Sequence, residues 1–101
     1  AKLTKEMMRI AVDSEFERKN ALLNLQRNRD EEDPIKACLK AKEANEIAVK
    51  EGKMTPEEFR EANRKADDEK DKALRSIYDE YYTLRNQLQK QCYDVLNDWD
   101  D

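Results

Sequence analysis

A turn signal stands near the middle of this chain, Gly52-Lys53-Met54-Thr55-Pro56-Glu57-Glu58-Phe59. Gly52 is the residue type that adopts the left-handed backbone conformation with which many helices end. Thr55 is placed to cap a following helix, with Pro56 as the first helical residue and Glu58 as the second member of a capping box. The stretch therefore predicts a tight turn between two helices.

The segment after this turn predicts one very long helix. It contains no glycine and no proline beyond Pro56, so we expect the helix to cover about 56–99. A helix of about 44 residues spans ~65 Å at ~1.5 Å per residue. A compact globule of this chain length has a radius of gyration of only ~13 Å. The helix length therefore predicts an elongated molecule.

The segment before the turn carries a second break at Asp33-Pro34, where Asp33 can cap a helix that begins at Pro34. We expect an all-α fold with three helices, at about 3–30, 34–51 and 56–99. They would form an elongated antiparallel helical hairpin or bundle with a very long C-terminal helix, in one domain over 1–101. Two arrangements stay open: a hairpin whose first arm is kinked at Pro34, and an up-down-up three-helix bundle.

Apolar residues recur at helical spacing along all of this sequence. On the long third helix one stripe comprises Phe59, Ala62, Ala66, Ala73, Ile77, Tyr81, Leu84, Leu88, Cys92, Val95 and Trp99. The first helix has two stripes, one of Leu3, Met7, Ile10, Ala21 and Leu25 and the other of Met8, Val12, Phe16 and Leu23. Burying each large apolar side chain is worth about 1.5–3 kcal/mol, so a two-sided helix favours two neighbours. We therefore expect a homodimer with Met8, Val12, Phe16 and Leu23 at its seam.

Charge dominates the composition of the 101 residues. Asp, Glu, Lys and Arg make up 44%, the formal net charge is −4, and acidic and basic residues interleave. An acidic chain without a basic patch argues against nucleic-acid binding. No apolar run approaches the ~18 residues of a membrane span, so we expect a cytoplasmic protein. Ala1 is what removal of an initiator Met leaves, which predicts a complete small protein, and Asp94, Asp98, Asp100 and Asp101 make its end acidic.

Catalytic and metal-binding patterns are weak. The chain has no histidine, no glycine-rich phosphate loop, and solitary serines at Ser14 and Ser76. A helical di-iron site pairs Glu with His, which this chain cannot supply. Cys38 and Cys92 stand beside apolar stripes and outside any CxxC motif, so we expect buried free thiols. The sequence predicts a protein that is not an enzyme and that holds no cofactor and no metal.

Aromatic residues concentrate near the C-terminus. Tyr82 and Tyr93 are three helical turns apart and so project to the same side. Tyr and Arg are enriched in binding hot spots. We expect a strip that binds another protein, consisting of Tyr78, Tyr82, Arg85, Gln89 and Tyr93. The predicted function is a non-enzymatic protein–protein interaction module that also self-associates. The alternative is a small viral or phage-encoded inhibitor whose acidic helices block a nucleic-acid-binding surface of a host complex.

Overall fold

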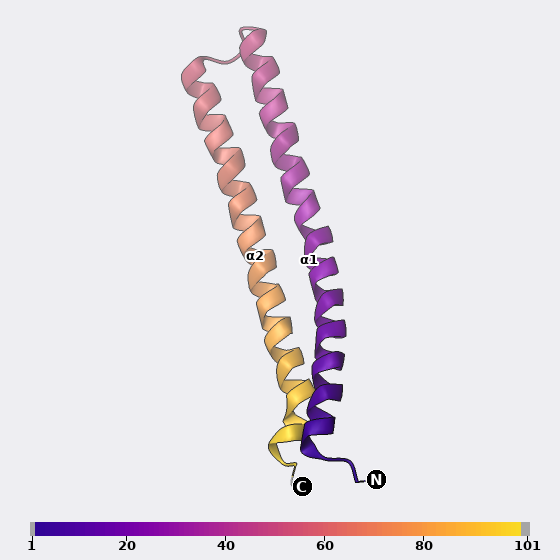
Figure 1. Ribbon diagram of the computed structural model, residues 1–101. Helices are drawn as coiled ribbons and strands as arrows, with labels where there is room; N and C mark the ends of the chain where they lie inside the picture. Colours follow the sequence, from indigo (N-terminus) through magenta and orange to yellow (C-terminus); the bar gives the residue numbers. More distant parts are fainter. Residues whose placement is uncertain (1, 100–101) are drawn as a thin grey trace. The chain divides into compact units, whose positions relative to one another are not determined.

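The computed structural model describes residues 2–99 and shows two helices joined by a short turn (Figure 1). Helix α1 spans Lys5–Lys50 and helix α2 spans Pro56–Asn97. The prediction of an all-α fold is confirmed, and no strand occurs in residues 2–99. The expectations about Ala1, Asp100 and Asp101 fall outside the described residues.

The prediction of three helices is wrong, because α1 continues through Pro34. The segments expected at 3–30 and 34–51 are one helix. Proline has no N–H to donate to the carbonyl of Asp30, and this costs helix stability. Two features offset the cost: strong helix formers such as Glu31, Glu32, Lys36 and Ala37 stand nearby, and Cys38, one turn later, is buried against α2. Packing after Pro34 thus overrides the local preference for a break.

The end of α1 is built as the sequence predicts. Gly52 has a φ of 73°, in the left-handed region. Its N–H donates to the carbonyl of Val49 at 3.0 Å, and the N–H of Lys53 donates to the carbonyl of Ala48 at 2.8 Å. These two bonds form a Schellman motif, which satisfies carbonyls that the helix end would otherwise leave without donors.

The start of α2 is also confirmed. The N–H of Glu58 donates to the hydroxyl of Thr55 at 3.1 Å, and the carboxylate of Glu58 accepts from the N–H of Thr55 at 3.1 Å. This is the reciprocal capping box, and Pro56 is the first residue of α2. The hydrogen bond from the Thr55 backbone lowers the pKa of the Glu58 carboxyl. The turn is therefore fixed at both of its ends by local hydrogen bonds.

Tertiary contacts divide the described chain into two units, which we treat separately. The terminal unit comprises residues 2–27 of the first half and 79–99 of the second. Its helix segments are antiparallel, since Tyr93 donates its hydroxyl proton to Asp13 and Tyr81 donates to Asn20 at 3.3 Å. Its core consists of Val12, Cys92 and Leu96, against which Met8, Phe16, Leu88 and Tyr93 pack.

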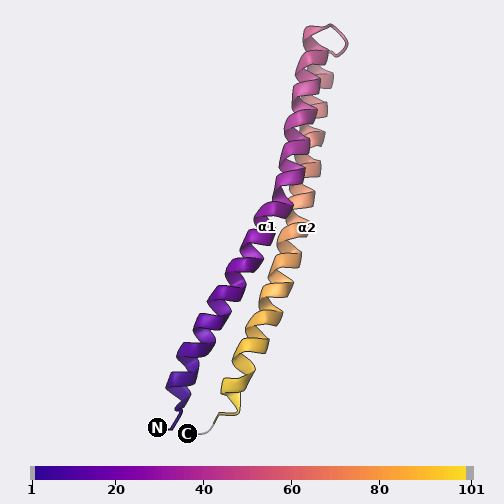
Figure 2. The ribbon, with the colours of Figure 1, turned by 90° about the vertical axis from the view of Figure 1, so that its right-hand side faces the viewer.

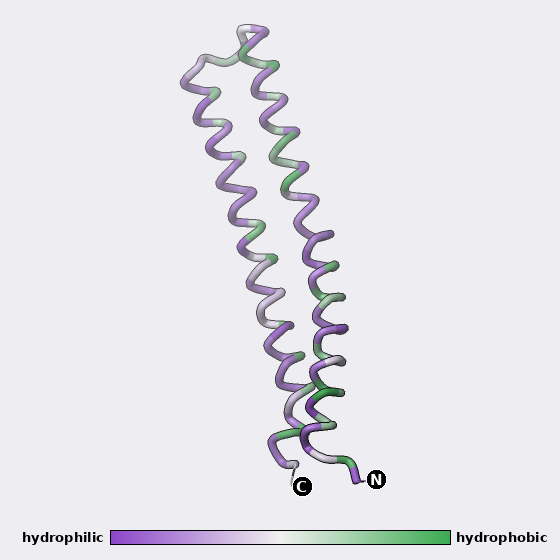
Figure 3. The backbone as a smooth tube through the Cα atoms, in the orientation of Figure 1, coloured by the Kyte–Doolittle hydropathy of each residue, from purple (hydrophilic) through white to green (hydrophobic). Residues whose placement is uncertain are grey.

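The turn unit comprises residues 28–78, and its two helix segments are joined by the turn (Figure 2). Polar side chains make contacts between these two segments. Asn45 donates to Asn63 at 3.0 Å, and the ammonium of Lys42 lies 2.7 Å from the carboxylate of Asp67. The thiol of Cys38 also donates to Asp67, at 3.5 Å. Apolar segments are scattered along helices that are mostly hydrophilic (Figure 3). Polar contacts between small side chains therefore take the place of a large apolar core in this unit.

The inward-facing residues of the terminal unit recur at spacings of four, four and three. On α2 they are Tyr81, Arg85, Leu88, Cys92 and Leu96, and Trp99 follows just after the helix. This differs from the expected stripe, because Leu84 and Val95 are exposed while their neighbours Arg85 and Leu96 face α1. Steps of four, four and three average ~3.67 residues per turn, close to the period of a straight α-helix. The residues of α2 that face α1 therefore stay on one side of the helix along the terminal unit.

Candidate protein-interaction surfaces

The tyrosine strip expected on α2 divides into exposed and inward-facing residues. Tyr82 is 43% exposed and Gln89 is exposed, both in the terminal unit. Tyr78 is 45% exposed but belongs to the turn unit. The ring of Tyr82 lies edge-on to the ring of Tyr81, with centroids 6.2 Å apart. The side chains of these three residues are therefore accessible to a partner.

Tyr93 and Arg85, the other two members of the strip, make contacts within the terminal unit. The Tyr93 ring lies edge-on to Phe16 with centroids 5.8 Å apart, and its hydroxyl donates to Asp13. This hydrogen bond to the Asp13 carboxylate raises the pKa of Tyr93. The Arg85 guanidinium stands 5.7 Å from the centroid of the Phe16 ring, within cation–π range. Both side chains therefore hold α1 to α2, and a partner could contact only their outer edges.

The four residues expected at a dimer seam also face α2 of the same chain. Val12 is 4% exposed, Met8 and Phe16 pack against it, and Leu23 is half-buried. Contacts within one chain thus account for most of their burial. The second stripe of the same helix is the one without such cover.

An outer stripe of α1 carries exposed apolar side chains. We define it as Met7, Ile10, Ala21 and Leu25 of α1 together with Leu3, which lies just before the helix, and each of them is exposed. Ile10 is 64% exposed and Leu25 is 55% exposed. Ile10 lies ~200° around the helix from the buried Val12, at ~100° per residue, so it points away from α2. The outer stripe is therefore a set of exposed apolar side chains, interrupted by Ser14 and Arg18, on the face of α1 that points away from α2.

A groove runs between α1 and α2 on another side of the terminal unit. It consists of two pockets of about 290 and 330 Å³ that share Lys19 and Gln91 in their linings. The wall on α1 comprises Ala11, Glu15, Lys19 and Leu22, and the wall on α2 comprises Leu84, Gln87, Gln91 and Val95. Met8, Val12 and Leu23 of the expected seam also line these pockets. Sequence reasoning missed the polar wall residues, although the repeat of four, four and three residues could have aligned them.

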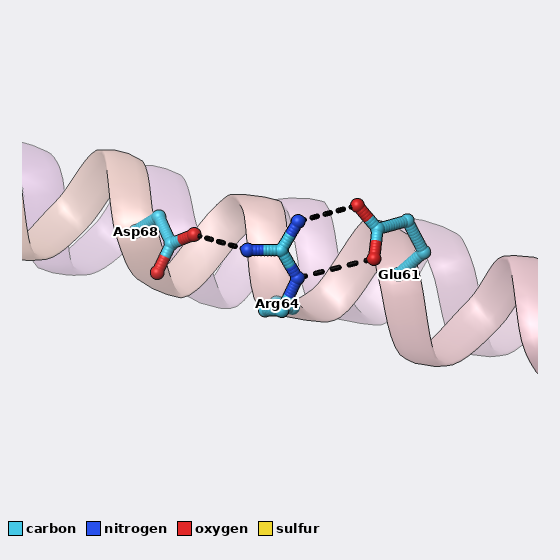
Figure 4. A network of polar contacts seen from close by, with 3 residues as sticks. All are labelled: Glu61, Arg64 and Asp68. Atoms are coloured by element: carbon cyan, nitrogen blue, oxygen red, sulfur yellow. Dashed lines mark hydrogen bonds and ion pairs between the residues drawn. The ribbon is translucent and has the colours of Figure 1, made fainter.

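The turn unit presents ion pairs rather than apolar faces on α2. Arg64 bridges Glu61 and Asp68, at 2.5 and 2.8 Å between nitrogen and oxygen (Figure 4). Asp67 lies between the ammonium groups of Lys42 and Lys70, and the hydrogen bond from Lys42 lowers its pKa. Alternating charges of this kind neutralise one another along the surface. No patch of one sign forms around these three acidic residues.

Within residues 2–99 no three side chains of His, Cys, Asp or Glu are placed to hold a metal ion. Cys38 and Cys92 are buried free thiols, as predicted. Over the same residues, neither helix has an apolar stretch long enough to cross a membrane.

Comparison of the chain with family models, with curated proteins and with solved structures gave no match in any of the three. The surfaces themselves are therefore the basis for a functional proposal.

Proposed function

We propose that this protein is a non-enzymatic interaction module that binds another protein through the outer stripe of α1. The observation that carries the proposal is the exposure of Met7, Ile10 and Leu25 on one face of α1, with exposed Leu3 just before the helix. An amphipathic helix that lays such a face into an apolar groove is a common mode of recognition between proteins. The partner proposed here therefore offers an apolar groove or a matching helix face.

Further support comes from the way the terminal unit is held together. The contacts of Tyr93, Phe16 and Arg85 hold its two helix segments together. The outer stripe is therefore not needed for the pairing of α1 with α2. A partner could cover it without separating the helices. Tyr82 and Gln89 of the terminal unit form a secondary contact region in this proposal. Buried free thiols at Cys38 and Cys92 suit a reducing compartment such as the cytoplasm.

Affinity capture with the tagged chain in an extract of its native host tests the proposal. We expect Ile10→Glu with Leu25→Glu to abolish capture of the bound protein while the helix content measured by circular dichroism stays unchanged. Leu39→Glu with Ile47→Glu is the matched control, since both residues are exposed and lie in the turn unit. Equal capture by the two double variants would contradict the assignment of the outer stripe.

Salt separates this proposal from the acidic-inhibitor alternative. Contacts between apolar groups persist at 0.5 M NaCl, whereas exposed charge pairs are screened over a few ångströms at high salt. We expect the captured protein to stay bound at 0.5 M NaCl. A basic protein that is released by salt and that still binds the Ile10→Glu, Leu25→Glu variant would favour the inhibitor instead.

A further inference from the structure

The chain exposes more surface than a folded monomer of its mass. Its accessible surface is 7894 Å² for 12.0 kDa, whereas folded monomers of this mass expose ~6,000 Å². The excess is about 1,900 Å², and a stable complex of standard size removes about 800 Å² from each partner. The protein therefore has enough uncovered surface for a dimer interface in addition to the outer stripe.

The groove of the terminal unit has a pattern of residues that is complementary to the same pattern in the opposite direction. Along α1 its wall reads apolar, acidic, basic, apolar, at Ala11, Glu15, Lys19 and Leu22. Along α2 it reads apolar, amide, amide, apolar, at Leu84, Gln87, Gln91 and Val95. One pocket joins Ala11 to Val95 and the other joins Leu22 to Leu84, so the polar residues lie midway along both walls. Reversing the direction of the groove sets apolar residues against apolar residues, amides against amides, and Glu15 against Lys19.

This symmetry is what a two-fold interface requires, because the same patch must be complementary to itself. We propose that a second copy of this chain occupies the groove, with a two-fold axis between Glu15 and Lys19. The axis sets α1 antiparallel to the partner's α1 and α2 antiparallel to the partner's α2. Four antiparallel helix segments then enclose a common core, as in a four-helix bundle.

The charges of the groove fit this occupant. Glu15 and Lys19 form an ion pair of 2.7 Å within one chain, and their side chains are partly exposed. The two-fold axis places each Glu15 opposite the partner's Lys19, and each Gln87 opposite the partner's Gln91. Like charges do not meet, and each amide both donates and accepts hydrogen bonds. One positive and one negative side chain give the groove no net charge, which does not favour a strongly basic or acidic occupant.

The apolar ends of the groove complete the contact. Leu22 is 63% exposed and lies opposite the partner's Ala11, so a large side chain meets a small one. Leu84 and Val95, both exposed, lie opposite each other across the two copies. The second copy also covers Met8, Val12 and Leu23 at the floor, three of the four residues that the sequence places at a dimer seam. The inference goes beyond the proposed function, because the groove and the outer stripe are different faces.

Charge reversal tests the inference. We expect the wild-type chain to sediment as a dimer at micromolar concentration, and Lys19→Glu to raise the dimer dissociation constant at least tenfold. The double variant Glu15→Lys, Lys19→Glu exchanges the charges, keeps them complementary across the axis, and should restore the dimer. Lys36→Glu is the matched control, since it converts another Glu–Lys pair four residues apart, Glu32–Lys36, outside the groove. It should leave the dissociation constant unchanged.

Cross-linking locates the interface independently of stability. In a mixture of ¹⁴N- and ¹⁵N-labelled chains, a carbodiimide should join Lys19 of one isotope label to Glu15 of the other. A wild-type chain that stays monomeric at 100 μM overturns the inference and leaves the groove to a different protein. A dimer that is insensitive to Lys19→Glu, or that yields Lys19–Glu15 links only within one label, also overturns it. Partner capture through the outer stripe is read separately, so either proposal can fail alone.

Discussion

The hydroxyl of Tyr93 donates a hydrogen bond to the carboxylate of Asp13, which joins the two helix segments of the terminal unit. The bond connects residues 80 positions apart in the sequence. The Tyr93 ring packs at the same time on Phe16, beside the core of Val12, Cys92 and Leu96. A residue expected on a binding surface thus serves the pairing of the helices.

Tyr93→Phe should remove this hydrogen bond and keep the ring. Because Asp13 raises the pKa of the Tyr93 hydroxyl, the bond stabilises the fold below the ordinary tyrosine pKa near 10 and is lost as pH rises through the folded-state value. At pH 7 we expect wild type to unfold at higher urea concentration than Tyr93→Phe. By pH 11 the difference should shrink or reverse, since ionised Tyr93 would face a carboxylate. A difference that is independent of pH would contradict the role given to this pair.

Leu96→Ala should be strongly destabilising. Leu96 is 5% exposed in the core of the terminal unit, and truncating a buried leucine costs about 2–5 kcal/mol. Leu39→Ala is the matched control, since Leu39 is 58% exposed and a substitution there should change the free energy of unfolding by no more than about 0.5 kcal/mol. Urea denaturation followed by circular dichroism measures both. Similar losses for the two variants would mean that the seam passes through other residues than those described.

Pro34→Ala should stabilise the protein. Pro34 lies inside α1, where proline is about 3 kcal/mol less favourable than alanine. We expect a higher melting temperature for Pro34→Ala, with Pro34→Gly between it and wild type, because glycine keeps the N–H but is a weak helix former. Thermal unfolding by circular dichroism gives the order. If Pro34→Ala melts below wild type, packing of the proline ring outweighs the missing hydrogen bond.

Thr55→Ala should cost about 1 kcal/mol, as expected when an N-cap hydroxyl is removed. The hydroxyl of Thr55 accepts from the N–H of Glu58, and alanine leaves that donor to water. Thr55→Ser retains the oxygen and should keep most of the stability. The free energies of unfolding of the three chains test the ranking, and equal values for Ala and Ser would show that the capping box contributes little.

Predictions from the sequence are confirmed where the structure depends on residues that are close together in the chain. Gly52 and Thr55 define the two sides of the turn through bonds within a few residues, so their types were enough. The predicted helix break at Pro34 is wrong because its local preference is opposed by packing from α2, which is distant in the sequence. The prediction that Leu84 and Val95 face α1 is also wrong. A helical spacing of three or four residues fits either of two neighbouring positions, and the structure has Arg85 and Leu96 there instead.

The amino-acid sequence by itself determined that the chain is helical and where it turns, because propensity and capping act over one or two helical turns. Only the tertiary structure decided which apolar stripe of α1 is covered by α2, and that Tyr93 contacts Phe16 and Asp13 of α1. The reason is that both stripes consist of apolar residues at helical spacing, and only the position of α2 distinguishes them. Burial is a property of the pair of helices, and a single helix does not contain that information.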